Sequence, residues 1–362
     1  MKRQFALFDQ SWDWRLFCSA LALSGISLVA LTSAAAQLDP GLVLKQAIWV
    51  GLGIAACLVV ASVPYMRWID FGVFLYPLAV LLLVFVMIAG AVRLGASRWI
   101  SVFGFSLQPS ELAKLSLACL VSRYAAGQGY PIRWRGVAIA AVLTGVPALL
   151  IFAQPDLGTS SILGAIWLGT IWVAGMSRRL LAALAAAGMV AGPVGWHLLK
   201  DYQKLRLTAF INPDADPLGA GYTIIQSRIA IGSGRLLGRG WLSGTQGQLN
   251  FLPERHSDFL YSVVGEEWGF LGSLLVVALC GVVLWRMTAI ARDTSDAQGR
   301  LLVAALVSWL GYQAVVNMGM VMGVLPVVGV PLPFVSYGGS AMVVSWIALG
   351  CALSVRRFGT RF

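Results

Sequence analysis

The 362-residue length alone would predict two or three soluble domains, but the composition excludes a soluble protein. Only 11% of the residues are charged and 59% are hydrophobic, whereas soluble domains carry about 25% charged residues. The net charge of +11 comes without any nucleic-acid-binding motif, so we expect no nucleic-acid partner. The composition therefore predicts an all-α, polytopic integral membrane protein.

Apolar stretches recur along the whole chain, and each is about the length that a helix needs to cross ~30 Å of hydrocarbon. We expect about ten transmembrane helices, at 16–36, 44–63, 70–90, 109–125, 136–153, 157–175, 179–198, 267–288, 301–323 and 337–355. A large extracytoplasmic loop, 199–260, separates the seventh and eighth spans. We expect one transmembrane domain over residues 1–362.

The basic residues predict which way the bundle points, because short cytoplasmic loops carry an excess of Lys and Arg. The short loops on one side hold only Arg93 and Arg98. The N-terminus and the alternate loops hold Lys2, Arg3, Arg15, Arg67, Arg123, Arg133, Arg135, Arg178, Arg179, Arg286, Arg292, Arg300, Arg356, Arg357 and Arg361. We therefore expect a multi-pass protein of the cytoplasmic (inner) membrane, with both termini in the cytoplasm.

Four polar segments fit neither plain spans nor plain loops. They are "SRWISVFGFSLQPSELAKL" (97–115), "QPDLGTS" (154–160), the loop 199–260 and "NMGMVMGVLPVVGVPLPFVSYGGS" (317–340). The predicted orientation puts the loop part of all four on the outer face, with Lys45 near the same face. The last segment holds prolines and glycines in an apolar context, and such backbone must be buried in protein or face a water-filled cavity. Together these segments predict an outward-facing site.

Ionisable residues within predicted spans are costly, by ~2.5–3.5 kcal/mol even on the lenient insertion scale. Glu111 and Lys114 are three residues apart and share a helix face. They form either a structural ion pair or part of a cavity wall that orients a substrate or metal. Asp156 follows Pro155 at the start of a span, where it either caps the helix or contributes to the site.

The stretch "FLPERHSDF" (251–259) brings Glu254 and Asp258 to the point where the long loop re-enters the membrane. Both carboxylates belong either to a solvated loop end or to a reaction centre. A carboxylate in that position can act as a general base. The sequence holds no Ser–His–Asp set, no H-E-x-x-H motif and no zinc spacing. One or two acids among basic residues suit a reaction whose substrate brings its own anionic leaving group.

Four motifs, in this order along the chain, resemble the SEDS family of bacterial cell-wall synthases: "QPSELAKL", "QPDLGTS", "GTQGQLNFLPERHSDF" with "GEEWGFLG", and "GVLPVVGVPLPFVSYGGS". The third and fourth resemble the elongation branch of the family more than the division branch. Two departures are Ser257, where the family usually has Thr, and "GGSAM" in place of "GGSSM". Neither departure removes an ionisable group.

The resemblance implies a peptidoglycan glycosyltransferase that polymerises lipid II into β-1,4 glycan strands on the outer face of the membrane during cell elongation, which determines cell shape. Because lipid II carries an α-linked sugar pyrophosphate, the β-linked product requires one inverting displacement. A glycosidase needs two carboxyl groups because its leaving group is poor. Here the leaving group is a pyrophosphate, so one base and positive charge suffice. Asp258 matches the essential acidic position of the family and is the expected general base.

The resemblance also implies further site residues and the partners. The expected substrate-binding residues are Arg98, Glu111, Lys114 and Asp156, which match polar positions of the family's central cavity, together with Arg206 and Lys45 as basic candidates for the pyrophosphate. A divalent cation, Mg²⁺ or Mn²⁺, is expected at Asp258 or Asp156, and no organic cofactor is expected. The expected partners are lipid II, a class B penicillin-binding protein with transpeptidase activity, rod-complex scaffold and cytoskeletal proteins, and membrane lipids.

Two other functions fit the same features. A lipid II flippase would use the same substrate and the same intramembrane charges. However, alternating access requires gates on both faces, and the unusual polar segments lie on one. A non-enzymatic scaffold for the transpeptidase would not need Asp258. The sequence therefore favours the polymerase.

Overall fold

The computed structural model describes residues 12–36, 39, 41–89, 91–93, 96–102, 105–199, 201–219, 221–249 and 251–359. Within these ranges a helix covers each of the ten predicted spans. These are α1 (Trp14–Ala35), α2 (Gly41–Ser62), α3 (Tyr65–Ala89), α4 (Pro109–Ala126), α5 (Trp134–Ala153), α6 (Leu157–Val173), α7 (Arg178–Leu198), α11 (Leu260–Asp293), α12 (Ala297–Val321) and α13 (Gly339–Phe358). The predicted helical membrane protein is confirmed.

Seven of the described helices are long and apolar enough to cross a membrane: α1, α2, α3, α5, α11, α12 and α13. Helix α6 is apolar but shorter. In α12, 72% of the most apolar window is buried, against 22% in α3. Helix α12 is therefore a central element of the bundle, and polar side chains on it face protein rather than lipid.

Three short antiparallel strands connect α3 to α4, and the sequence did not predict them. They are β1 (Ala91–Arg93), β2 (Ala96–Val102) and β3 (Phe105–Leu107), in the order β1-β2-β3. Val92 pairs with Ser97, and Ser101 pairs with Ser106. The strands position the start of α4, where Pro109 occupies the first turn.

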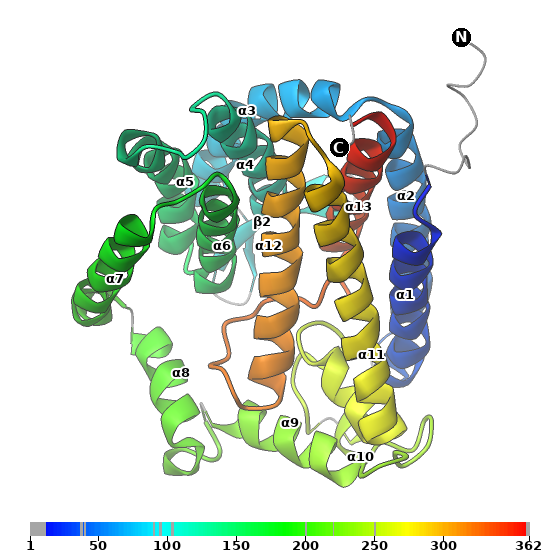
Figure 1. Ribbon diagram of the computed structural model, residues 1–362. Coiled ribbons are helices and arrows are strands. Elements are labelled where there is room, and N and C mark those ends of the chain that lie inside the picture. Colours follow the sequence, from blue (N-terminus) through cyan, green and yellow to red (C-terminus); the bar gives the residue numbers. More distant parts are fainter. Residues whose placement is uncertain are drawn as a thin grey trace.

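The long loop 199–260 forms α8 (Asp201–Ile211), the 3₁₀ helix η1 (Pro213–Ala215), α9 (Tyr222–Ser233) and α10 (Thr245–Gln248). These elements lie at the lower end of the molecule in Figure 1, opposite the end where α1 begins and α13 ends. The chain then enters α11, which bends at Gly269, where φ is 65°. A Cβ at Gly269 would lie 2.3 Å from the backbone nitrogen of Gly238, so only glycine fits this approach.

The segment 322–338 contains no helix and runs from the lower end of α12 back into the bundle, where α13 begins (Figure 1). Its backbone takes left-handed conformations at Gly323, Gly329 and Phe334, with φ of 72°, 73° and 63°. The side chains of Val330 and Val335 are fully buried. The later part of this segment is therefore covered by protein, whereas Met322 and Val324 at its start are exposed. The sequence predicted irregular backbone that is buried in protein or faces a water-filled cavity.

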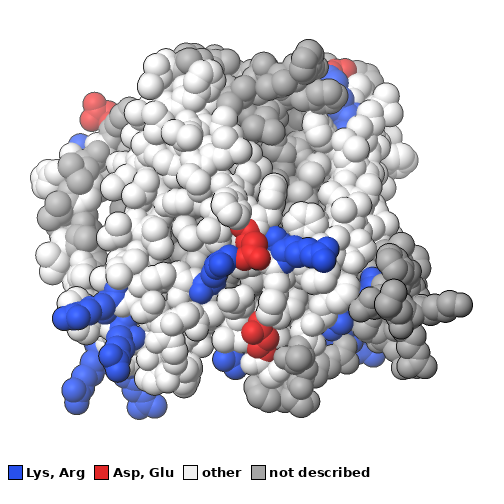
Figure 2. Space-filling view, turned by 90° about the horizontal axis from the view of Figure 1, so that it is seen from above, with Lys and Arg blue, Asp and Glu red and all other residues white. Residues whose placement is uncertain are grey.

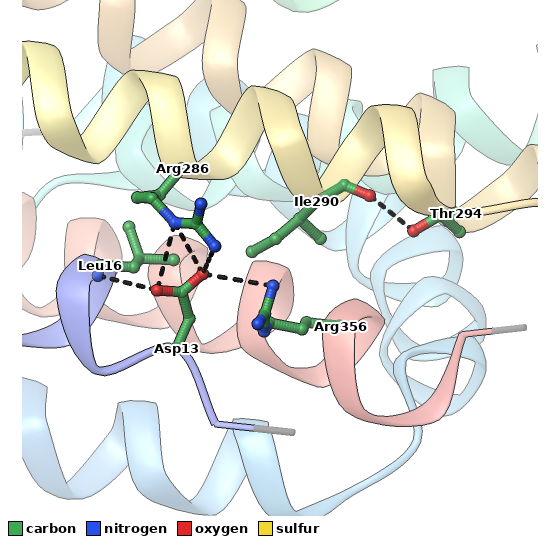
Figure 3. Close-up of polar contacts among 6 residues, drawn as sticks. All are labelled: Asp13, Leu16, Arg286, Ile290, Thr294 and Arg356. Atoms are coloured by element: carbon green, nitrogen blue, oxygen red, sulfur yellow. Dashed lines mark hydrogen bonds and ion pairs between the residues drawn. The ribbon is translucent and has the colours of Figure 1, made fainter. Parts of the chain in front are cut away.

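The opposite end, which we call the inner end, is seen from above in Figure 2, where Lys and Arg side chains predominate over Asp and Glu. Asp13 is the buried acid at this end, and its carboxylate joins three helices (Figure 3). It accepts hydrogen bonds from the Leu16 amide (3.2 Å) and Arg286 Nη2 (2.7 Å), and it lies 3.4 Å from Arg356 Nη1. This cluster ties together the start of α1 and the inner ends of α11 and α13.

Candidate functional site

Asp258 lies in the turn that precedes α11 and is partly buried. The oxygen Oδ2 of its carboxylate lies beside Gly329 of the segment 322–338, 3.5 Å from the position that a Cβ would occupy there. The predicted general base therefore lies beside bent, partly buried backbone rather than at the open surface of the long loop. Of the two interpretations of the re-entry stretch, a solvated loop end describes Glu254, which is exposed, better than it describes Asp258.

The carboxylate of Asp156 caps α6. Its Oδ1 accepts from the Thr159 amide at 3.0 Å, and its Oδ2 accepts from Thr159 Oγ1 at 2.9 Å. The predicted capping role is confirmed. The first turn of α6 also contacts the segment 322–338, because a Cβ at Gly158 would lie 2.5 Å from the Val328 carbonyl oxygen. Asp156 and Asp258 therefore belong to elements that both contact residues 328–330.

Glu111 and Lys114 form an ion pair of 2.7 Å in the first turns of α4, and both side chains are buried. The Lys114 ammonium lies 4.9 Å from the centroid of the Trp309 ring on α12. The Glu111 oxygen Oε2 has no hydrogen-bond partner among the described residues. The structure thus contains the ion pair. Because Oε2 has a free acceptor position within the described structure, Glu111 can also bind a substrate group or a metal ion.

Helix α12 relates this pair to Asp258. Trp309, Gln313 and Asn317 follow one another at four-residue spacing, so they lie on one face of the helix. Asn317 donates from Nδ2 to the Asp258 carbonyl oxygen at 2.9 Å and to the Val330 carbonyl oxygen at 2.7 Å. Trp309 lies eight residues away, which is about 12 Å along the helix axis. The ion pair therefore lies about two helical turns deeper than Asp258.

A side chain of α2 forms a hydrogen bond to the turn before α13. Gln46 is buried and donates from Nε2 to the Ser336 carbonyl oxygen at 3.2 Å. The neighbouring Lys45 is exposed and pairs with Asp39 at 3.3 Å. The ring of Tyr337, in the same turn, lies 5.8 Å from the ring of His256. Lys45 thus lies on the outer side near this turn, which is compatible with its predicted place at the rim of the site.

His256 lies two residues before Asp258 and is partly buried. Burial lowers the pKa of its imidazole; the carboxylate of Glu254 raises it, and the charge of Arg255 lowers it further, so the net pKa lies below the usual 6.5. At neutral pH the imidazole is therefore uncharged. It adds no positive charge beside the predicted base.

Arg206 is exposed on α8, which stands apart from α12 and α13 in Figure 1. The side chain of Arg98, on β2, lies outside the described residues.

Sequence reasoning missed the residues that organise the loop 238–246. Glu266 is fully buried and accepts from the Gln246 amide (2.9 Å) and Thr245 Oγ1 (3.2 Å). Glu267 accepts from the hydroxyl of Ser33 on α1. The adjacent acids in "GEEWG" inside an apolar helix were the available signal, because buried carboxylates need partners.

Asn317 was missed as well. It is the first residue of the segment 317–340. Its four-residue spacing from Gln313 and Trp309 was the available signal, because this spacing places the three side chains on one face of the helix.

The expected divalent cation was tested against the residues present. No group of three or more His, Cys, Asp or Glu side chains that could hold a metal occurs among the described residues. Both oxygens of Asp156 are already engaged by Thr159. The described side chains therefore do not form a preformed metal centre at Asp156 or Asp258. Magnesium sites that use one or two carboxylates rely on substrate phosphates for the remaining ligands.

Comparison with known proteins identifies the family. The model of the FtsW, RodA and SpoVE family, a cell cycle protein family, matches residues 13–361. The peptidoglycan glycosyltransferase MrdB of Escherichia coli (strain K12) is 41% identical over 336 residues, covering 92% of this chain and 90% of that protein.

Two solved structures are similar over almost the full length. A chain from a study of the structural coordination of polymerization and crosslinking by a peptidoglycan synthase complex superimposes with a TM-score of 0.83 at 32% identity, covering 96% of this chain and 98% of that one. The crystal structure of the rod shape determining protein RodA of Thermus thermophilus gives a TM-score of 0.73 at 29% identity, covering 98% of this chain and 99% of that one. The chain belongs to the SEDS family of FtsW, RodA and SpoVE proteins.

Proposed function

We propose that this protein is a peptidoglycan glycosyltransferase that polymerises lipid II into β-1,4 glycan strands during cell elongation. The relatives named above support the activity and the elongation branch, since they are named as a peptidoglycan glycosyltransferase and a rod shape determining protein. The observation that carries the proposal to this chain is the position of Asp258. Its carboxylate lies beside Gly329 in a bent, partly buried segment rather than at an exposed loop end.

In the proposed mechanism, Asp258 takes the proton from the acceptor hydroxyl as that oxygen attacks the anomeric carbon of the donor sugar. The bond to the lipid pyrophosphate breaks in the same in-line step, which inverts the configuration. A base of this kind typically contributes 10²–10⁴-fold in rate. The pyrophosphate leaves as a stable anion, so no second carboxyl group is required as an acid.

Positive charge must stabilise the leaving pyrophosphate. Lys114 is the buried candidate, and it carries its charge next to Glu111. Lys45 is the candidate at the rim. Arg98 is a further candidate because it matches a polar position of the family's central cavity, and Arg206 is a further basic candidate. A metal ion would add Lewis-acid stabilisation of the same anion, with Asp258 as its expected protein ligand; no step above depends on it.

The polymerase site is proposed to face the outside of the cytoplasmic membrane, with both termini in the cytoplasm. Basic side chains gather on the inner end (Figure 2), and α8, α9 and α10 lie at the other end (Figure 1). We also propose a class B penicillin-binding protein as the partner, together with rod-complex scaffold and cytoskeletal proteins. The similarity to a chain from a synthase complex that couples polymerization and crosslinking supports the first of these partners.

The test is synthesis of glycan by purified protein in detergent, supplied with fluorescently labelled lipid II. Detergent micelles have no second compartment, so transport is impossible and only polymerisation yields long products. A ladder of glycan chains is expected on a denaturing gel. If wild-type protein makes no chains alone or with its transpeptidase partner, yet moves lipid II across liposome bilayers, the flippase is the correct function.

A further inference from the structure

Asn317 donates a hydrogen bond from its side chain to the main chain of Asp258. Its side chain is fully buried in α12, and its amide nitrogen reaches two separate parts of the chain. One proton goes to the Asp258 carbonyl oxygen (2.9 Å) and the other to the Val330 carbonyl oxygen (2.7 Å). A single amide thus joins the re-entry turn to the segment 322–338.

The Asp258 carbonyl is available for this bond because it lies outside the regular ladder of α11. The amide of Ser262, four residues on, instead donates to the Phe259 carbonyl oxygen at 2.9 Å. Phe259, the capping residue of α11, makes no side-chain capping bond. A side chain from another helix, Asn317 on α12, therefore holds the peptide of Asp258 at the start of α11.

The second acceptor fixes the backbone that the carboxylate faces. Val330 follows Gly329, which has a left-handed conformation and lies beside the Asp258 oxygen Oδ2. Neither residue belongs to a helix or strand. Asn317 donates one amide proton to the Asp258 carbonyl oxygen and the other to the Val330 carbonyl oxygen. It therefore sets the spacing between Asp258 and the backbone of residues 328–330.

We propose that Asn317 is a positioning residue of the glycosyl transfer, which holds Asp258 against the 328–330 backbone at the depth where it meets the acceptor hydroxyl. This inference rests on the proposed function of Asp258 as the base. Asn317 contacts no substrate and acts through Asp258. The consequence is a defect in the chemical step rather than in substrate binding.

Gln313 provides a matched control on the same face of α12, one turn away. It is also a buried amide, at 2% exposure. It lines a small cavity of about 10 Å³, with Pro331–Phe334, Ser336 and three residues of α13. That volume suits about one water molecule. Replacing Gln313 removes a buried amide from the same environment without touching the main chain of Asp258.

The experiment compares Asn317→Leu with Gln313→Leu, wild type and Asp258→Ala in the detergent polymerisation assay. Leucine is compatible with a membrane helix, and Asn317→Ala substitutes if the Leu variant does not fold. Thermal unfolding gives the folded amount, and rates are expressed per folded protein. For Asn317→Leu we expect kcat to fall roughly 10²-fold, because misplacing a reacting group by about 1 Å costs that much. Its KM for lipid II stays within about 3-fold of wild type, and Gln313→Leu keeps kcat within about 3-fold.

Two outcomes overturn the inference. One is a kcat for Asn317→Leu, or for Asn317→Ala, that matches Gln313→Leu at equal stability. The other is a rise in KM with kcat unchanged, which would assign Asn317 to substrate binding. If wild type is inactive, or Asp258→Ala is as active as wild type, the proposed function fails instead. The assay therefore separates the two failures.

Discussion

The inner and outer ends of this protein are built in different ways. At the inner end, Asp13 is closed off by Arg286 and Arg356, and the left-handed residues of the described loops there are glycines, Gly129 and Gly175. Five described residues other than glycine adopt positive φ, and all belong to loops at the outer end: Pro155, Arg235, Leu242, Glu254 and Phe334. In the described loops, left-handed backbone at the inner end is confined to glycine, whereas at the outer end it also occurs at residues with a side chain.

Left-handed backbone at non-glycine residues costs of order 1–3 kcal/mol each, and it persists where surrounding structure enforces it. Such residues cluster at functional sites. Two of them belong to segments at Asp258: Glu254 precedes it in the same turn, and Phe334 belongs to the segment that its carboxylate contacts. The difference between the two ends agrees with the proposal that the end bearing Asp258 carries the chemistry.

After replacement of Asp258 itself, the largest expected effect comes from exchanging the charges of the buried pair. Glu111→Lys with Lys114→Glu preserves attraction across one helix face. If Lys114 faces the pyrophosphate, the exchange places a carboxylate where a cation is needed and lowers the polymerisation rate roughly 10²-fold. Thermal unfolding is measured alongside the rate. A double variant that is both stable and active makes the pair structural, and Arg98 and Arg206 become the leading candidates.

Gly158→Ala tests whether close packing of α6 against residues 328–330 supports the site. The added Cβ would lie 2.5 Å from the Val328 carbonyl oxygen, so the segment must shift. We expect a loss of about 1–3 kcal/mol in unfolding free energy and a lower rate per folded molecule. Gly164→Ala on the same helix is the control, because a Cβ there meets nothing within 4 Å. Equal behaviour of the two variants would show that the contact is unimportant.

At the inner end, Asp13→Asn is expected to lower stability and leave polymerisation per folded molecule unchanged. The Asp13 side chain is 2% exposed, whereas Arg286 and Arg356 are 16% and 21% exposed. Partial exposure of the guanidinium groups reduces the penalty for a buried pair to about 1–2 kcal/mol. Asp70→Asn, in an exposed pair with Arg123, should change stability by less than about 0.5 kcal/mol. A selective loss of activity in Asp13→Asn would contradict the division between the two ends.

The contact of Asp13 with Arg286 and Arg356 also predicts that the stability of the protein depends on pH. Burial alone would raise the pKa of Asp13, but hydrogen bonds from Arg286 and Leu16 and the charge of Arg356 hold it below its usual 3.8. Because the folded state then binds protons less readily than the unfolded state, the stabilisation is present above pH 3.8 and is lost as pH falls below it. The melting temperatures of wild type and Asp13→Asn should therefore converge below pH 3.8. A constant difference down to complete protonation would exclude this linkage.

The smallest perturbation tests which end is outside. In a variant lacking the native cysteines, a cysteine at Ser243 should react with a membrane-impermeant reagent on intact cells, and one at Asp293 should not. Both positions are exposed, and they lie at opposite ends of the bundle. Thr294, next to Asp293, is unsuitable because it is buried. The reverse labelling pattern would place the Asp258 end in the cytoplasm.

The sequence predicted the ten helices because each apolar stretch has the length of a membrane span, and no competing pattern existed. From the prolines and glycines of 322–338 it also predicted irregular backbone that is buried in protein or faces a cavity, and Val330 and Val335 of this segment are buried. It did not predict the strands β1, β2 and β3, since seven residues or fewer of mixed polarity carry no clear period.

The site was predicted less completely. The charged residues were visible because charges are rare in spans, and the pairing of Glu111 with Lys114 and the cap at Asp156 follow from local spacing. Asn317 and Gln46 act on carbonyl groups 13 and 290 residues away, and no local pattern encodes those contacts.

The central claim is that the Asp258 carboxylate is the base of an outward-facing polymerase, and Asp258→Asn tests it most directly. The amide keeps the size of the side chain but cannot accept the proton of the acceptor hydroxyl. In detergent with labelled lipid II, we expect glycan synthesis to fall by about 10²–10⁴-fold, with unchanged thermal stability. Glu254→Gln, in the same turn but exposed, should retain near wild-type synthesis. Near-normal glycan chains from Asp258→Asn would contradict the account.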